Sequence, residues 1–125
     1  MISLPTLLGK LTAILQAHRL CQRTEIGETK AFSPDQFFFK IRSELTGEYK
    51  FQVRIYYNQG HVDYAYQLFT DVPLLRWDNK EEFPHLTTYP HHHHDWHGHV
   101  KASLLTGNPV EDLKIVLQQL DTELR

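Results

Sequence analysis

Hydrophobic residues recur at helical spacing near both ends of the chain. The first such segment has Ser3 in position for an N-cap and Pro5 in the first turn, and it predicts a helix that ends near residues 18–20. The last segment has stronger signals, because Asn108 is a good capping residue and Pro109 follows at the first helical position. The two apolar stripes consist of Leu4, Leu7, Leu8, Leu11, Ile14 and Leu15, and of Val110, Leu113, Leu117, Leu120 and Leu124.

Between these helices the hydrophobic period changes to two, which is typical of strands that bury one face. The alternation runs over residues 36–45, 49–57, 62–68 and 74–78. A weaker pattern over 23–32 indicates an additional irregular strand. Because only short turns separate these strands, neighbours in sequence must pair antiparallel. We therefore predict one α+β domain over residues 1–125, with an antiparallel β-meander of about four to six strands packed against an N-terminal and a C-terminal helix.

The composition fits a globular domain and excludes several classes of protein. The 125 residues are 41% hydrophobic and 12% aromatic, which is too apolar for a disordered chain. The net charge of −2 gives no overall attraction to nucleic acid or membrane, so a polyanion would have to be bound locally. A single cysteine, Cys21, excludes an internal disulfide framework, and no apolar run approaches the ~20 residues of a membrane span. These features predict a soluble cytoplasmic protein that does not act at a membrane.

The most unusual segment follows the last predicted strand and is rich in histidine. Six of the nine histidines lie within residues 91–99, at positions His91, His92, His93, His94, His97 and His99. An affinity tag is usually terminal and uninterrupted, whereas this run is internal and broken by Asp95, Trp96 and Gly98, so we take it as native. Residues 83–107 show no sustained period, and a segment of this length without structure of its own is usually functional or disordered.

The end of the last predicted strand supplies further reactive groups. Period two places Arg76 and Asp78 on one face, and Asn79 follows them. If residues 91–94 return to this point, two chemistries are open. In metal-free cleavage of RNA, one imidazole takes the 2′-OH proton, another protonates the leaving oxygen, and Arg76 holds the phosphate. In metal-assisted hydrolysis, imidazoles and Asp78 hold Zn²⁺ or another borderline ion, which lowers the pKa of a bound water.

Purely structural roles also explain these residues. Arg76 and Asp78 could simply pair at a sheet edge, and Asp78 with Asn79 could form an Asx turn. The histidines could be exposed loop residues whose metal affinity is incidental. The run, which ends in the alternation of His97 and His99, could also be an exposed edge strand. Tyr64 and Tyr66 fall on the inward face of their strand, where tyrosines belong more often to the core than to a catalytic site.

Three stretches of the chain together resemble the TumE family of bacterial toxin–antitoxin systems. They are Tyr64-Ala65-Tyr66-Gln67, Leu75-Arg76-Trp77-Asp78-Asn79 and Thr88-Tyr89-Pro90-His91-His92-His93-His94. The family pattern is a Tyr-x-Tyr strand, then Arg-aromatic-Asp-Asn, then a Pro-His-His-Lys-His block before a C-terminal helix, and the overlap covers about residues 34–124. Two positions depart from it: Glu81-Glu82-Phe83, with His85 nearby, stands where relatives often carry Pro-His-His, and His93 replaces the lysine.

The resemblance implies a toxin that acts with a helix-turn-helix antitoxin encoded beside it. It points to a ribonuclease or another phosphodiester-cleaving enzyme, with RNA as the expected substrate. The expected catalytic residues are Arg76, Asp78, Asn79, His91, His92 and His94. If a metal is used, Asp78, His92 and His94 are expected to hold a divalent ion such as Zn, Ni or Mn. A non-catalytic partner-binding protein and a metal-binding module remain alternatives, and a homodimer is left open.

Overall fold

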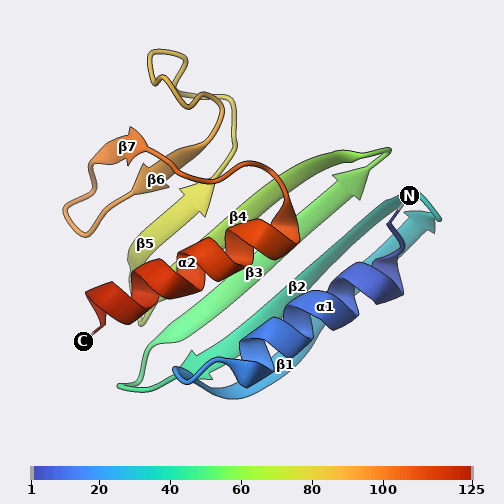
Figure 1. The fold of residues 1–125 in the computed structure, drawn as a ribbon, viewed down its shortest axis with the longest axis horizontal. Coiled ribbons are helices and arrows are strands. Elements are labelled where there is room, and N and C mark those ends of the chain that lie inside the picture. Colours follow the sequence, from blue (N-terminus) through green and yellow to red (C-terminus); the bar gives the residue numbers. More distant parts are fainter. Residues whose placement is uncertain (1, 125) are drawn as a thin grey trace.

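Two helices lie on one face of a single antiparallel sheet (Figure 1). This computed structural model describes residues 2–124. The elements in chain order are α1 (Leu4–Ala17), β1 (Cys21–Ser33), β2 (Gln36–Leu45), β3 (Lys50–Asn58), β4 (His61–Phe69), β5 (Pro73–Asp78), β6 (His92–His94), β7 (Val100–Ala102) and α2 (Pro109–Glu123). The seven strands are hydrogen-bonded in chain order, each antiparallel to the next. The predicted α+β meander with a helix at each end is confirmed.

Both helices begin where their capping signals predict. The Ser3 hydroxyl accepts a hydrogen bond from the backbone N–H of Thr6 at 3.3 Å. Asn108 Oδ1 accepts from the backbone N–H groups of Val110 and Glu111 at 3.2 and 3.3 Å. These contacts satisfy N–H groups that the first turn of a helix leaves free, and so they determine where each helix starts over the sheet. Neither α1 nor α2 has the length and apolar character needed to cross a membrane.

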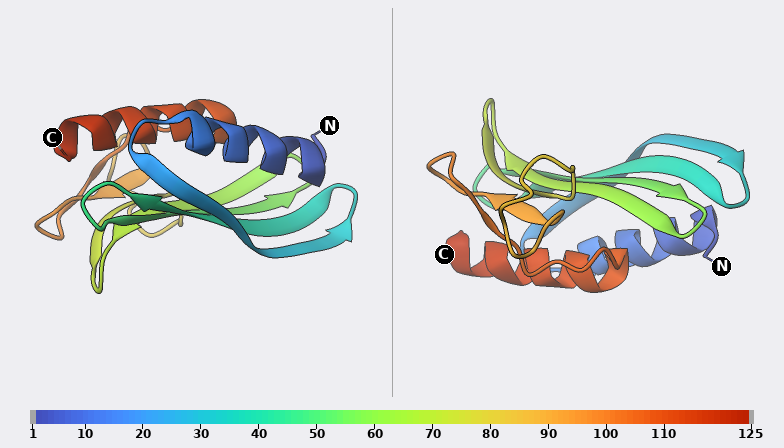
Figure 2. Two further views of the ribbon diagram at one scale, coloured as in Figure 1. Left: turned by 90° about the horizontal axis from the view of Figure 1, so that it is seen from below. Right: turned by 90° about the horizontal axis from the view of Figure 1, so that it is seen from above.

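The core lies between the sheet and the two helices, on the face that both views of Figure 2 show as covered. Alternate positions of the strands supply it, as period two requires. Its largest fully buried side chains are Trp77, Tyr66, Phe37, Phe39, Phe51, Leu7, Leu11, Leu15, Ile41, Leu45, Ile55 and Leu68. Helix α1 packs against β1, β2 and α2, and α2 packs also against β4. Within residues 2–124 no helix covers the opposite face of the sheet, which we call the open face.

The histidine-rich segment adds two strands that the sequence analysis did not predict. Strands β6 and β7 extend the sheet beyond β5. The sheet therefore has seven strands, whereas about four to six were predicted. Each has only three residues, so it is too short for a period of two to be recognised. The side chains of β6 are histidines rather than alternating apolar and polar residues. The main-chain pairing with β5, a tertiary contact, therefore defines this part of the sheet.

Candidate active site

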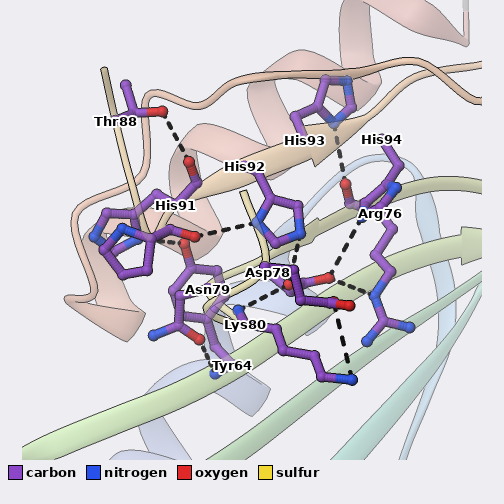
Figure 3. Close-up of polar contacts among 12 residues, drawn as sticks. Tyr64, Arg76, Asp78, Asn79, Lys80, Thr88, His91, His92, His93 and His94 are labelled. Atoms are coloured by element: carbon purple, nitrogen blue, oxygen red, sulfur yellow. Dashed lines mark hydrogen bonds and ion pairs between the residues drawn. The ribbon is translucent and has the colours of Figure 1, made fainter. Parts of the chain in front are cut away.

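Strand β6 divides the histidine run between the two faces of the sheet. Its register with β5 places Asp78 opposite His92, Trp77 opposite His93 and Arg76 opposite His94. Because side chains alternate along a strand, His92 and His94 share the open face with Arg76 and Asp78. His91 and His93 lie on the face covered by the helices, where they contact Tyr64 and Trp77. The expected approach of the histidine block to the end of β5 is present for His92 and His94 (Figure 3).

A buried carboxylate lies at the centre of this arrangement. The Asp78 side chain is 6% exposed and accepts hydrogen bonds from Arg76 Nε at 2.7 Å and from the backbone N–H of Lys80 at 3.0 Å. His92 Nε2 lies 2.9 Å from Asp78 Oδ1, and His94 Nε2 lies 3.8 Å from Oδ2. A buried carboxylate requires such partners because it has lost its hydration. We call Arg76, Asp78, His92 and His94 the Asp78 cluster.

His92 is the most buried member of the Asp78 cluster, with a side chain that is 1% exposed. Its Nδ1 lies 3.1 Å from the carbonyl oxygen of Pro90, and since a carbonyl only accepts, Nδ1 carries the hydrogen. In the neutral ring Nε2 then has a free lone pair. Nε2 is close to Asp78 but not in the direction of a hydrogen bond, and it has no hydrogen-bond partner within residues 2–124. Metal-binding histidines are held in this way, with one nitrogen bonded to a carbonyl and the other free.

His94 and Arg76 form the accessible side of the cluster, with side chains 33% and 39% exposed. Arg76 uses only Nε in its contact with Asp78, so its two terminal amino groups make no hydrogen bond or ion pair with any other described residue. Phe83 packs edge-on against the rings of His92 and His94, with centroid distances of 4.7 and 6.0 Å. The aromatic ring shields the imidazoles on one side, while the guanidinium is left free to bind an anion.

A pocket of about 460 Å³ is lined by Arg76 and Asp78 of the cluster, but not by His92 or His94, and extends over the open face of β4 and β3. Its size is within the range of small-molecule sites. The cationic side chains that line it are Arg54, Arg76 and Lys80. Besides Asp78, two exposed carboxylates line it, those of Asp63 and Glu81. Arg76 and Asp78 therefore border a pocket that holds three cationic side chains and three carboxylates, and Lys80 also pairs with Glu82 at 3.9 Å.

Two of the predicted site residues have other contacts. The Asn79 side chain bonds the backbone of β4, because Oδ1 accepts from the N–H of Tyr64 at 3.0 Å and Nδ2 donates to the carbonyl of Val62 at 2.7 Å. Nδ1 of His91 lies 2.7 Å from the Tyr64 hydroxyl, on the face covered by the helices. Burial raises the pKa of Tyr64 far above its usual value, so this hydroxyl keeps its proton. Asn79 thus joins the end of β5 to β4, and His91 belongs to a separate contact.

The sequence analysis did not identify Phe83, Arg54, Tyr56 or Lys80 as site residues. Arg54 and Tyr56 lie on β3, and only the pairing of β3 with β4 and of β4 with β5 brings them beside Asp78. Period two did place them on the outward face of their strand, which was the one available signal. Phe83 lies in an irregular segment, and no pattern in the sequence indicated that it would pack on the histidines.

The geometry suits a metal ion. Asp78, His92 and His94 each offer one donor atom, and these atoms lie within 4.8 Å of one another. Two imidazole nitrogens and one carboxylate oxygen are ligands that zinc and other first-row divalent ions accept in proteins. One of these donors, Nε2 of buried His92, makes no hydrogen bond within residues 2–124, which agrees with the same fit.

The family model for toxin TumE matches residues 10–124, nearly the whole chain. This chain belongs to the TumE toxin family. The resemblance that rested on three short stretches is thereby confirmed. No curated protein and no solved structure matches the chain. As a TumE toxin, it is expected to have an antitoxin partner.

We predict that three histidines of this TumE chain make its stability dependent on pH. Burial lowers the pKa values of His91, His93 and His94. In the unfolded chain these imidazoles keep a pKa near 6.5, so as the pH falls the unfolded state takes up protons first. We expect the melting temperature, measured in EDTA, to be constant above about pH 7.5 and to fall as the pH decreases through about 6.5 towards the folded-state values.

The variant His93→Phe isolates one contribution to this dependence. The His93 ring stacks on Trp77 with a centroid distance of 4.5 Å, and phenylalanine can keep that stacking but cannot take up a proton. Its melting temperature should therefore fall less steeply between pH 7.5 and 5.5 than that of the wild type. An equal slope in the two proteins would show that His93 does not contribute.

Proposed function

We propose that this toxin cleaves phosphodiester bonds, with Asp78, His92 and His94 holding a divalent ion and Arg76 binding the phosphate. The observation that carries the proposal is the convergence of one donor atom each from Asp78, His92 and His94 within 4.8 Å of one another. His92 Nε2 lies 2.9 Å from Asp78 Oδ1 but makes no hydrogen bond with any described residue. Native proteins rarely leave a buried polar nitrogen unsatisfied. A metal ion shared with Asp78 and His94 would satisfy it.

The ligand types suggest which ion would bind. Two imidazoles and one carboxylate are suited to Zn, Ni or Mn rather than to Ca or Mg, which prefer oxygen ligands. A bound ion of this kind would lower the pKa of a coordinated water and polarise a phosphoryl oxygen. Pro90 contributes through its carbonyl oxygen, which holds the His92 ring in the tautomer that leaves Nε2 free.

The charges around the cluster favour a phosphodiester as substrate. Arg76 directs an unpaired guanidinium end to solvent, and planar guanidinium groups bind phosphate oxygens in pairs. Asp78 fixes the orientation of this guanidinium through its bond to Nε. Arg54 and Lys80 line the same pocket and would add to the attraction for an anion. Phe83 excludes water from one side of the histidine rings.

Burial argues against a metal-free mechanism with two imidazoles. Such a mechanism needs two histidines that can touch the substrate on opposite sides of the scissile bond. Of the two histidines in the Asp78 cluster, only His94 is accessible, because the His92 side chain is 1% exposed. His91 and His93 lie on the other face of the sheet. The metal-assisted chemistry therefore fits the accessible groups better.

The test is cleavage of bis(p-nitrophenyl) phosphate and of an RNA oligonucleotide by the purified chain. Activity should be absent in EDTA and should return when Zn, Ni or Mn is supplied in excess of the chelator. His94→Gln should not be restored by any of these ions. His99→Gln, which changes an exposed histidine of the same run, is the matched control and should respond as the wild type does.

Two results would contradict the proposed metal-dependent cleavage, and they can be told apart. Full activity in EDTA would exclude the metal and leave acid–base chemistry at His94. Absence of cleavage under every condition, combined with continued growth inhibition in cells, would favour a non-catalytic toxin that acts by binding a partner. Binding of metal alone decides nothing, because exposed neighbouring histidines bind Ni or Zn whether or not an ion is catalytic.

The proposal includes the cellular context. We expect the toxin to act on RNA in the cytoplasm and to be neutralised by a helix-turn-helix protein encoded beside it. Co-purification of the chain with the product of the adjacent gene tests this expectation, and the mass of the complex would also show whether the toxin is a homodimer.

A further inference from the structure

Basic residues without acidic partners are concentrated on the open face of β2 and β3. Lys40, Arg42, Lys50 and Arg54 form no ion pair with any residue of 2–124, whereas most other basic residues in that range do. All four side chains lie on the face opposite the helices, since the buried positions of β2 and β3 alternate with them. With a net charge of −2 for the whole chain, this positive charge is local.

These charges are in register with the Asp78 cluster. Cross-strand pairing joins Lys40 to Arg54, Arg54 to Ala65, Ala65 to Asp78 and Asp78 to His92, in one row across five strands. Adjacent strands are about 4.8 Å apart, so the row extends about 14 Å from Lys40 to Asp78. The middle position is alanine, whose small side chain leaves the pocket between Arg54 and Arg76 open. A linear polyanion could follow this row to the cluster.

Aromatic rings accompany the charges. Phe38 and Tyr56 lie directly opposite each other on β2 and β3, one step from the row of charges, and both are half-buried. Lys40 Nζ and the Arg54 guanidinium lie 5.8 and 5.5 Å from the centroid of the Phe38 ring. Tyr56 lines the same pocket as Arg54, Arg76 and Asp78. Paired cations and rings on an open sheet face are the combination with which proteins bind unpaired bases and their phosphates.

Few acidic side chains lie near the basic residues of the open face. Asp63 lines the pocket and lies 3.1 Å from the His61 ring, and Glu81 lines its far end. Glu44 lies near the end of β2, opposite Lys50, and Glu25 of β1 lies opposite Arg42. None of them lies in the row between Lys40 and Asp78. The row therefore carries two positive charges and no carboxylate before it reaches Asp78.

We infer that the open face of β2, β3 and β4 binds single-stranded RNA and guides it to the Asp78 cluster, with phosphates on Lys40 and Arg54 and bases stacked on Tyr56 and Phe38. This inference rests on the proposed function for the choice of polymer. Duplex DNA does not fit, because its bases are stacked inside the helix and cannot reach aromatic rings on a flat sheet. RNA presents unstacked bases in loops and ends.

The experiment measures binding without cleavage. A fluorescein-labelled, unstructured 12-nucleotide RNA is titrated with the full chain in EDTA, and fluorescence anisotropy is recorded at salt concentrations from 50 to 200 mM. The double variant Lys40→Gln/Arg54→Gln removes two charges from the open face. The matched control Lys10→Gln/Lys114→Gln removes two charges from the exposed sides of α1 and α2. Cleavage of bis(p-nitrophenyl) phosphate by the wild type is measured in parallel, because it tests the proposed chemistry alone.

The wild type and the control should bind RNA alike. The open-face double variant should bind about tenfold more weakly for each lost phosphate contact. Its plot of log K against log salt should be less steep by about 1.4, since each phosphate contact on a single strand contributes about 0.7. Tyr56→Ala should weaken binding by about 5- to 150-fold through lost stacking.

Several outcomes would overturn the inference. Equal binding by the open-face variant and the control would place the RNA elsewhere. Tighter binding of a single-stranded DNA of the same sequence would overturn the choice of RNA. Absence of RNA binding by a wild type that cleaves bis(p-nitrophenyl) phosphate would reject this surface and leave the proposed function intact. If the protein binds RNA as expected but cleaves neither substrate, the RNA-binding surface is supported and the proposed cleavage is rejected.

Discussion

Arg76→Lys is expected to abolish growth inhibition when the toxin is expressed without its antitoxin, while the protein stays folded. Lysine keeps the positive charge but cannot bond Asp78 through Nε and also present two amino groups to a phosphate. Loss of one preorganised group that stabilises developing charge reduces turnover by about 100-fold or more. Cleavage of bis(p-nitrophenyl) phosphate and colony formation after induction measure the effect.

The side chain of Arg76 is 39% exposed and lysine keeps a positive charge near the buried Asp78, so the protein should stay folded with only a modest fall in melting temperature. Arg23→Lys is a matched control, because Arg23 is an exposed arginine that also pairs with an acidic neighbour, Glu25, on an outer strand. It should remain toxic. If Arg76→Lys stays toxic, or if it melts far below the wild type, Arg76 has a structural role in pairing with Asp78 and the proposed phosphate contact is wrong.

Trp77→Ala should have the largest effect on stability, although Trp77 is the neighbour of both Arg76 and Asp78. Its ring is buried on the opposite face of β5, where Nε1 donates to Gln119 Oε1 of α2 at 2.8 Å. Removing a large buried aromatic side chain costs about 3–5 kcal/mol, through lost burial and the cavity that remains. Urea unfolding curves of the two proteins measure this difference in free energy of unfolding.

The control for this prediction is Leu104→Ala, since Leu104 is an exposed leucine on the same half of the molecule. Its free energy of unfolding should stay within about 0.5 kcal/mol of the wild type. Trp77→Ala should also reduce toxicity, because β5 and the paired β6 would lose their anchor on α2 and the Asp78 cluster would be less well placed. A loss of less than about 1 kcal/mol would show that the edge of the sheet is not held through Trp77.

The two predictions concern adjacent residues of one strand with opposite roles. Period two puts Arg76 and Asp78 on the open face and Trp77 on the covered face, and both the sequence pattern and the structure place them so. Trp77, although directly adjacent to Arg76 and Asp78 in the chain, is therefore expected to be essential for the fold and to make no contact with substrate.

Much of the fold was predictable because its signals are local. Helix caps act within four residues, and an alternating strand reveals its buried face without any knowledge of its partners. The helix boundaries and strands β2 to β5 followed from such signals. Strands β6 and β7 could not be located from the sequence, since three residues are too few for a period and their pairing partners are 6 to 18 positions away along the chain.

For the site, the sequence by itself determined which groups were available: the reactive residues at the end of β5, the histidine run, and the resemblance to TumE toxins. Only the tertiary structure decided which of them meet. The register of β6 on β5 selects His92 and His94 for the cluster and sends His91 and His93 to the other face, because a shift by one residue would exchange the two sets. The row of charges from Lys40 to Asp78 likewise exists only through strand pairing, which no local pattern specifies.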